Sequence, residues 1–253
     1  MRMLRKGRYI ARLAETPAEV EKAQHLRHFC FFGGEGLDAD HFDAICRHLL
    51  VEDAAGRLLG CCRVLLLPDA GQIGRSYSAQ VYGLSRLARF PGPVAEVGRF
   101  CLHPEARDPE ILRLAWAALT RIVDQTGTRL LFGCSSFPGT DPEAHAESLA
   151  LLAQRHLGPD DWRPSVKAAQ SVPLPGGGPV DPRHALAGLP PLLRSYLAMG
   201  GWVSDHAVID RGLGTLHVFT GLEVARVPPS RARLLRELAA EGAAPVDEGA
   251  SGL

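Results

Sequence analysis

The feature that most constrains this chain is a carboxylate and a guanidinium inside one apolar run. The run covers residues 94–107 (VAEVGRFCLHPEAR), in which Glu96 and Arg99 stand three positions apart. Such a run is typical of a central strand, where burying charged groups is costly unless they are paired. Side chains alternate along a regular strand, so these two would point to opposite faces. They share a face only if an extra residue bulges the strand, which Gly98 permits.

A bulge at Gly98 would also change the sheet around it. The neighbouring strand would separate there, and backbone N–H groups would be left unpaired beside Glu96 and Arg99. Two interpretations of this stretch therefore stay open: a functional site at the splayed strand, or a structural ion pair at a strand end.

The rest of the chain predicts the elements around this strand. Thr16, Pro17 and Glu19 form a capping box with proline at the first helical position, so a helix should run from there to the GGEG of residues 33–36. Apolar residues at steps of three and four predict further helices, and runs between turn residues predict strands. The other helices are expected at residues 109–125, 142–156, 191–199 and 230–240. The strands are expected at residues 9–13, 48–51, 58–67, 129–134, 203–209 and 216–224, besides the run that begins at residue 94.

These elements predict one domain of the α/β or α+β class over residues 1–228, with a mixed central sheet and helices on its faces. Proline and glycine are frequent in residues 158–190, which predicts a loop-rich excursion and not a second core. Residues 229–253 should form an amphipathic helix followed by a disordered acidic tail of small residues.

The composition excludes several partner classes. The formal net charge is zero, which disfavours a protein that binds nucleic acid by neutralising phosphates. The six cysteines lack C-x-x-C spacing and predict buried free thiols in a reducing compartment. His25 and His28 have no third ligand at a recognisable spacing, so no metal is expected. No run is long enough to span a membrane, and residues 1–15 lack the apolar core of a signal peptide. We therefore expect a cytoplasmic protein, whose surface can still touch a membrane.

The element order, with a bulged fourth strand followed by a helix, is similar to the GNAT acyltransferase fold. Seven residues stand in the order and local spacing of the signature residues of acyl-homoserine-lactone synthases: Arg27, Phe31, Asp40, Asp43, Arg63, Glu96 and Arg99. Three longer stretches resemble another branch, the L-ornithine Nα-acyltransferases of ornithine-lipid synthesis: EVGRFCLHPEAR, LLFGCSSFPGTDPE and PPLLRSYLAMGGWVSDHAVID. The resemblance covers residues 9–224.

Two departures narrow this resemblance. The tryptophan that the lactone synthases carry between Phe31 and Asp40 is absent, which argues against lactone synthesis. The usual GNAT pyrophosphate loop is replaced by HPEARDPEIL, which argues against coenzyme A as the donor. The resemblance thus implies transfer of a 3-hydroxyacyl chain from acyl carrier protein to the α-amine of ornithine, giving lyso-ornithine lipid, with no bound cofactor.

Amide formation by this route needs a base and a stabilised oxyanion. Glu96 is the candidate base for the attacking amine, and the N–H groups at the bulge would meet the oxyanion. Asp40 and Asp43 share a side within a helical turn and would hold the cationic amino acid, or else form a solvated acidic turn with Asp40 as a helix cap. Arg63 and Arg99 would either bind the substrate carboxylate or hold those acids in place.

The remaining roles depend more heavily on the resemblance. An arginine at position 27 would ordinarily be a surface residue of its helix, and only the resemblance assigns Arg27 to the substrate site. Arg107 and Arg113 are candidates for docking the acidic carrier protein, because they flank the start of the helix after the central strand. The candidate residues for the acyl and pantetheine channel are Phe100, Cys101, Phe132, Cys134 and Ser135, although isolated strand cysteines are more often packing residues and Ser135 can simply cap its strand. The basic residues that would contact anionic lipid at the inner membrane are Arg2, Arg5, Lys6 and Arg8.

Two alternatives to this function stay open. One is another GNAT-type acyltransferase, either a coenzyme A-dependent N-acetyltransferase or a lactone synthase. The other is a non-catalytic module that binds acyl chains or the carrier protein. Release of free thiol from an acyl carrier protein thioester separates the enzymes from the module, and the mass of the product separates the enzymes from each other.

Overall fold

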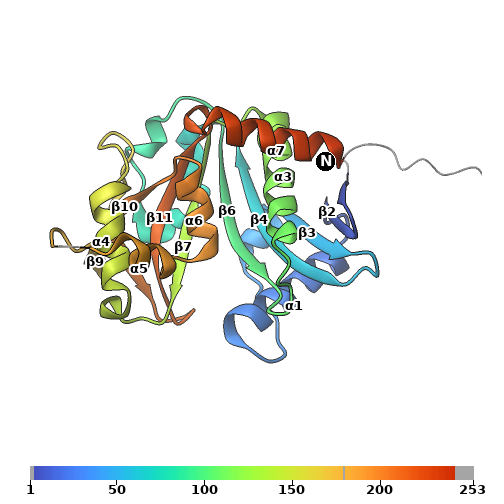
Figure 1. Cartoon of the computed structure of the whole chain (residues 1–253), viewed down its shortest axis with the longest axis horizontal. Coiled ribbons are helices and arrows are strands. Elements are labelled where there is room, and N and C mark those ends of the chain that lie inside the picture. The colour runs from blue at the N-terminus through green and yellow to red at the C-terminus, as the bar shows by residue number, and fades with distance from the viewer. Residues whose placement is uncertain (1–2, 179, 243–253) are drawn as a thin grey trace, which may run out of the picture.

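A computed structural model describes residues 3–178 and 180–242 (Figure 1). Nine strands form one sheet in the order β1-β2-β3-β4-β6-β7-β11-β10-β9, and its neighbours are antiparallel except for the parallel pair β6 and β7. A second sheet contains two short strands, β5 (Tyr82–Gly83) and β8 (Ser165–Val166). The strands of the large sheet are β1 (Leu4–Lys6), β2 (Tyr9–Leu13), β3 (Arg47–Asp53), β4 (Leu58–Leu67), β6 (Val94–Leu102), β7 (Leu130–Pro138), β9 (Ser171–Pro173), β10 (Trp202–Asp210) and β11 (Thr215–Glu223).

The helices begin and end close to where capping and breaking residues predict. Thr16 caps the first helix through the expected capping box with Glu19, and Gly33, at φ 76°, ends it. The helices are α1 (Pro17–Phe32), α2 (Ser78–Val81), α3 (Pro109–Thr126), α4 (Ala146–Arg155), α5 (Pro182–Ala187), α6 (Pro191–Ala198) and α7 (Pro229–Glu241). Short 3-10 turns add η1 (His41–Ala44), η2 (Ala70–Arg75), η3 (Leu87–Arg89), η4 (Pro142–His145) and η5 (Val224–Arg226).

Helices cover both faces of the sheet, as predicted. On one face, α3 and α7 pack over the N-terminal strands, and α4, α5 and α6 pack over β10 and β11. Figure 1 shows α7 crossing one end of α3, and the two helices pack against each other. The other face carries α1, whose Ala23 shares an apolar cluster with Cys101 of β6. It also carries the segment between β4 and β6, whose Tyr82 shares a cluster with Phe132.

The central strand β6 is bulged, but not at the residue expected from the sequence. Arg63 of β4 pairs with Gly98, whereas Cys61 pairs with Cys101, so two residues of β6 face one residue of β4. Arg99 is the residue in the left-handed region, at φ 52°, and within the described ranges it is the only non-glycine with a positive φ. The bulge that was predicted at Gly98 is therefore present directly after it, and its left-handed residue is Arg99. The extra residue brings Arg99 to the face that carries Glu96.

β6 and β7 lie side by side only at their beginnings. Residues 94–96 pair with residues 130–132, and no ladder pair joins the two strands beyond that point in the part of the chain that the structure describes. A Cβ on Gly133 would lie 2.3 Å from the carbonyl oxygen of Val97, so glycine is required where the strands separate. The predicted splay of the sheet is thus present, and it starts beside Glu96.

The structure also contains elements that the sequence did not predict. β1 extends the sheet at one edge, and β9 extends it at the other. Residues 158–190, expected as loop, include β8, β9 and α5. Among the described residues no helix combines the length and the apolar character needed to cross a membrane. The predicted disordered tail beyond residue 242 lies outside the described residues.

Candidate active site

Glu96 is buried and held by three hydrogen-bond donors from one short segment. Its Oε2 accepts the N–H of Tyr77 at 2.9 Å. Its Oε1 accepts the N–H of Ser78 at 2.7 Å and the Ser78 hydroxyl at 2.6 Å. Burial raises the pKa of Glu96, and these donors, together with the charge of Arg63, offset part of that rise. A carboxyl group in this setting is a stronger base than an exposed glutamate.

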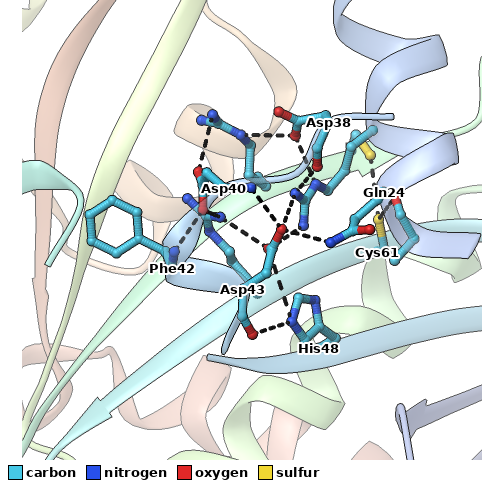
Figure 2. Close-up of polar contacts among 12 residues, drawn as sticks. Gln24, Asp38, Asp40, Phe42, Asp43, His48 and Cys61 are labelled. Carbon is cyan, nitrogen blue, oxygen red and sulfur yellow. Dashed lines mark hydrogen bonds and ion pairs between the residues drawn. The ribbon is translucent and has the colours of Figure 1, made fainter. Parts of the chain in front are cut away.

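A network of three aspartates and three arginines lies beside Glu96, at the splayed end of β6. The aspartates come from one stretch, residues 38–43, which leads into η1. The arginines come from three elements, with Arg27 on α1, Arg63 on β4 and Arg99 on β6. Figure 2 shows Asp38, Asp40 and Asp43 converging on one group of polar contacts.

Arg27 binds two of these aspartates from the buried side of the network. Its side chain is only 1% exposed, with Nε 2.8 Å from Asp38 Oδ2 and Nη1 2.8 Å from Asp43 Oδ1. Burial alone would raise the pKa of Asp43, but the hydrogen bonds and charge of Arg27 hold it well below the usual range. Arg27 is therefore a core residue, unlike most arginines on helix surfaces.

Arg63 of β4 and Arg99 of β6 each bind two of the aspartates. Arg63 Nη1 lies 2.5 Å from Asp40 Oδ1 and 3.1 Å from Asp43 Oδ1. Arg99 Nε lies 3.0 Å from Asp38 Oδ2, and its Nη2 lies 3.7 Å from Asp40 Oδ2. Each carboxylate therefore faces two guanidinium groups, and the formal charges of the six side chains sum to zero.

Asp40 and Asp43 also hold the backbone of η1. Asp40 is its N-cap and accepts the N–H of Phe42 at 2.9 Å, while Asp43 accepts the N–H of Asp40 at 3.2 Å. Gln24 and His48 contact Asp43 from α1 and β3. The structural alternative, Asp40 as a helix cap, is thus present in the fold, and the assignment of this pair to substrate binding stays a prediction.

Tyr77 connects Glu96 with this network. Its ring centroid lies 5.0 Å from the guanidinium carbon of Arg99, a cation–π distance, while its backbone N–H binds Glu96. Its hydroxyl donates to Asp210 Oδ2 at 3.4 Å. Sequence reasoning missed Tyr77, Asp210 and Asp38. The only available signal for Asp38 was its place in the acidic stretch LDADHFDAI.

The predicted channel residues do not share one face of the sheet. Phe132 and Cys134 pack on the face of Glu96, and Cys134 Sγ lies 3.5 Å from the Ser78 hydroxyl oxygen. Cys101 packs on that face too, but under α1, whereas Phe100 packs toward α3. Ser135 is buried and accepts a hydrogen bond from Thr220. Burial raises the pKa of the Cys134 thiol to about 12, so it is a neutral packing group.

An apolar groove lies on the opposite face of the sheet from Glu96. It measures about 690 Å³ and is bounded by α3, α7 and the ends of β7 and β11. None of the five predicted channel residues is among the described residues that line it. Its apolar lining includes Trp116, Leu131, Met199, Leu222 and Leu235.

The start of α3 is occupied by its own capping carboxylate. Asp108 accepts the N–H of Glu110 at 2.9 Å and the hydroxyl of Tyr9 at 2.9 Å, and Pro109 takes the first helical position. Arg107 and Arg113 lie exposed on either side of this cap, and Arg113 pairs with Glu110. Among the described residues no group of three or more histidine, cysteine, aspartate or glutamate side chains is arranged so that it could hold a metal ion.

Known proteins resemble this chain over most of its length. A family profile described as an acetyltransferase (GNAT) domain matches residues 27–117. The L-ornithine N(alpha)-acyltransferase of Rhodobacter capsulatus is 34% identical over 227 residues, covering 83% of this chain and 88% of that protein. The enzyme of the same name from Rhizobium meliloti is 33% identical over 237 residues, covering 85% and 80%. Among solved structures, FeeM, an N-acyl amino acid synthase from uncultured soil microbes, aligns over 92% of this chain and 97% of its own, with 14% identity and a TM-score of 0.48.

Proposed function

This chain belongs to the L-ornithine Nα-acyltransferase family, and we propose that it transfers a 3-hydroxyacyl chain from acyl carrier protein to the α-amino group of L-ornithine, giving a lyso-ornithine lipid. The fold is a GNAT acyltransferase domain. The observation that carries the proposal is the buried Glu96 at the point where β6 leaves β7, linked through Tyr77 to the guanidinium of Arg99.

Glu96 is proposed to take the proton from the attacking amine. The amine is protonated at neutral pH and attacks the thioester carbonyl only as the free base. The raised pKa of Glu96, caused by its burial, makes its carboxylate a better acceptor than an exposed one. The tetrahedral intermediate then carries an oxyanion, which backbone N–H groups at the bulge of β6 would stabilise. Collapse of that intermediate breaks the C–S bond and releases the carrier thiol.

Arg99 is proposed to bind the carboxylate of the acceptor amino acid. Its side chain is 13% exposed, compared with 1% for Arg27 and 3% for Arg63. Arg99 is therefore the guanidinium of the network that a substrate reaches most easily. The other two then act as supports, because they fix the aspartates that orient Arg99.

The start of α3 supports a carrier-protein donor. A diphosphate needs free N–H groups at a helix N-terminus, and the dipole there favours its charge. In this chain the carboxylate of Asp108 already takes the N–H of Glu110, and Pro109 has no N–H to offer. A carrier protein brings its pantetheine arm without a diphosphate. Its acidic surface would be steered by exposed Arg107 and Arg113, mainly through the association rate.

The product also suggests where the enzyme works. A lyso-lipid with one acyl chain partitions to a membrane surface. Arg5 and Arg8 are exposed at the N-terminal edge of the sheet and would contact anionic lipid there, whereas Lys6 pairs with Glu241 at 3.0 Å. Arg2 lies outside the described residues. Peripheral contact with the inner membrane face is accordingly part of the proposal.

The test compares one acyl chain on two carriers. We expect acyl carrier protein thioesters to react with ornithine far faster than the matching coenzyme A thioesters, and salt to slow only the former. Reversing Arg107 and Arg113 to glutamate should slow the carrier-protein reaction alone. The matched control reverses two exposed arginines on α4 and α5, Arg155 and Arg183, and should change neither reaction.

Each alternative function has its own outcome in this test. The donor assignment would be contradicted if acyl carrier protein and coenzyme A thioesters reacted at equal rates, and if neither salt nor the charge reversals at Arg107 and Arg113 changed those rates. A lactone product would indicate a lactone synthase. Binding of acyl carrier protein without release of thiol would indicate a non-catalytic module.

A further inference from the structure

The network of aspartates and arginines leaves little free negative charge for a cationic substrate. Asp38, Asp40 and Asp43 are each held by two arginines, and Asp38 and Asp43 are 8% exposed. An ammonium group that bound Asp43 would have to displace the guanidinium of Arg27, which is buried and would lose its partner. Ornithine carries a side-chain ammonium in addition to its α-amine, so its recognition needs a carboxylate that lacks a cation.

Asp210, the last residue of β10, is such a carboxylate. Its side chain is half-buried, its Oδ1 accepts the N–H of Leu213 at 3.0 Å, and its Oδ2 accepts the Tyr77 hydroxyl at a long 3.4 Å. Across residues 3–178 and 180–242 no arginine, lysine or histidine forms an ion pair with it. The adjacent Arg211 turns away and donates its Nε–H to Gln170 at 2.9 Å.

The surroundings of Asp210 also lack a titrating cation. His217 of β11 lies close enough for Asp210 to influence its charge, but burial lowers the pKa of His217 to about 4, so its ring is neutral at physiological pH. Among the described residues the side-chain hydrogen bond that Asp210 accepts comes from the Tyr77 hydroxyl, a weak and neutral donor. An ammonium ion that approached Asp210 would therefore gain an ion pair and displace no other cation.

We propose that Asp210 binds the side-chain ammonium of the acceptor amino acid, and thereby selects ornithine over amino acids with uncharged side chains; this rests on the proposed function. Tyr77 contacts all three groups that would bind the acceptor amino acid. Its N–H contacts the base Glu96, its ring lies beside the guanidinium of Arg99, and its hydroxyl contacts Asp210. A base, a cation and a free carboxylate thus surround one tyrosine. These three groups complement the α-amine, the carboxylate and the side-chain ammonium of ornithine.

The assignment predicts selectivity and not general activity. Glu96 and Arg99 act on groups that every α-amino acid has, so only the contact with Asp210 distinguishes ornithine. Norvaline has the same carbon chain without the terminal amine and leaves Asp210 unpaired. Losing one charged hydrogen-bond partner in such a site typically costs about 10- to 100-fold in kcat/KM.

The experiment measures kcat/KM for ornithine and for norvaline with the wild-type protein and with Asp210→Asn. Asparagine keeps an oxygen that can accept the Leu213 N–H, so the turn after β10 should be retained. We expect wild type to prefer ornithine about 10- to 100-fold, and Asp210→Asn to lose that preference through ornithine alone, with norvaline unchanged. The matched control is Asp205→Asn on the same strand, where the carboxylate pairs with Arg163 at 3.4 Å, and it should keep the preference.

The outcomes separate this inference from the proposed function. If wild type acylates ornithine and Asp210→Asn keeps the full preference over norvaline, Asp210 does not bind the ammonium, although the acyltransferase assignment stands. An equal loss for both acceptors would likewise overturn the inference, since a role in folding or in the base step would then explain it. If wild type acylates no amino acid from acyl carrier protein, the proposed function fails first and the inference fails with it.

Discussion

Replacing Glu96 by glutamine tests the base and has a cost that the structure predicts. The amide oxygen can still accept the N–H and the hydroxyl of Ser78, but the amide nitrogen then faces the N–H of Tyr77, which loses its acceptor. An unsatisfied buried donor costs about 1–3 kcal/mol. In a protein of this size each kcal/mol lowers Tm by roughly 2–4 °C. Loss of the base should reduce turnover by about a hundredfold or more.

The assay follows thiol release from an acyl carrier protein thioester with saturating ornithine, alongside thermal unfolding. Since burial raises the pKa of Glu96 above its ordinary value of 4.5, the wild-type acid limb of kcat/KM should lie above that pH and vanish in Glu96→Gln. The control, Ser78→Ala, removes one donor to the carboxylate but keeps the base. Its acid limb should move to higher pH, because the charged form loses a hydrogen bond, while its plateau turnover persists.

Two results would refute this reasoning. One is a folded Glu96→Gln protein that retains turnover within a few-fold of wild type. The other is an equal loss of plateau turnover in Glu96→Gln and Ser78→Ala, which would indicate that Glu96 only anchors the start of α2.

Two further predictions concern the charged network. Asp43→Asn should lower the free energy of unfolding, measured in urea, by about 3–5 kcal/mol, because it leaves the buried Arg27 with one partner fewer. A loss below about 1 kcal/mol would contradict a network in which Arg27 depends on Asp43. Burial alone would raise the pKa of Asp40 and of Asp43, but their arginines hold both below the ordinary value of 3.8. The unfolded chain therefore binds protons first, so the stability that these carboxylates contribute is full at pH 7, begins to fall near the ordinary pKa of 3.8, and is lower at pH 3 than at pH 7. Equal unfolding midpoints at these two pH values would show that the network contributes nothing.

The sequence predicted the elements whose signals are local. The capping box at Thr16 marks the start of α1, and the turn of residues 53–56 joins β3 to β4 as expected. β1 and β9 carry no comparable signal, since each is three residues long and exists only through pairing with an edge of the sheet. Pairing between distant segments cannot be deduced from the composition of either one.

In the candidate site, too, the sequence predicted what depends on neighbouring residues and missed the contacts between distant segments. Spacing within residues 38–43 correctly predicts that Asp40 and Asp43 lie on one side of a helical turn. It does not show that three arginines from three elements neutralise them, because those contacts depend on the tertiary fold. Tyr77 and Asp210 belong to segments that are 133 positions apart. Only the packing of the segment between β4 and β6 against the end of β10 makes them neighbours.

The left-handed conformation of Arg99 connects these observations. An arginine at φ 52° costs about 1–2 kcal/mol relative to ordinary backbone, and Gly98 next to it would accept that conformation at no steric cost. The bulge at Arg99 places its Nε 3.0 Å from Asp38 Oδ2 and its guanidinium over the ring of Tyr77. These contacts offset the strain and hold Arg99 over the ring of Tyr77, whose N–H binds Glu96 and whose hydroxyl contacts Asp210.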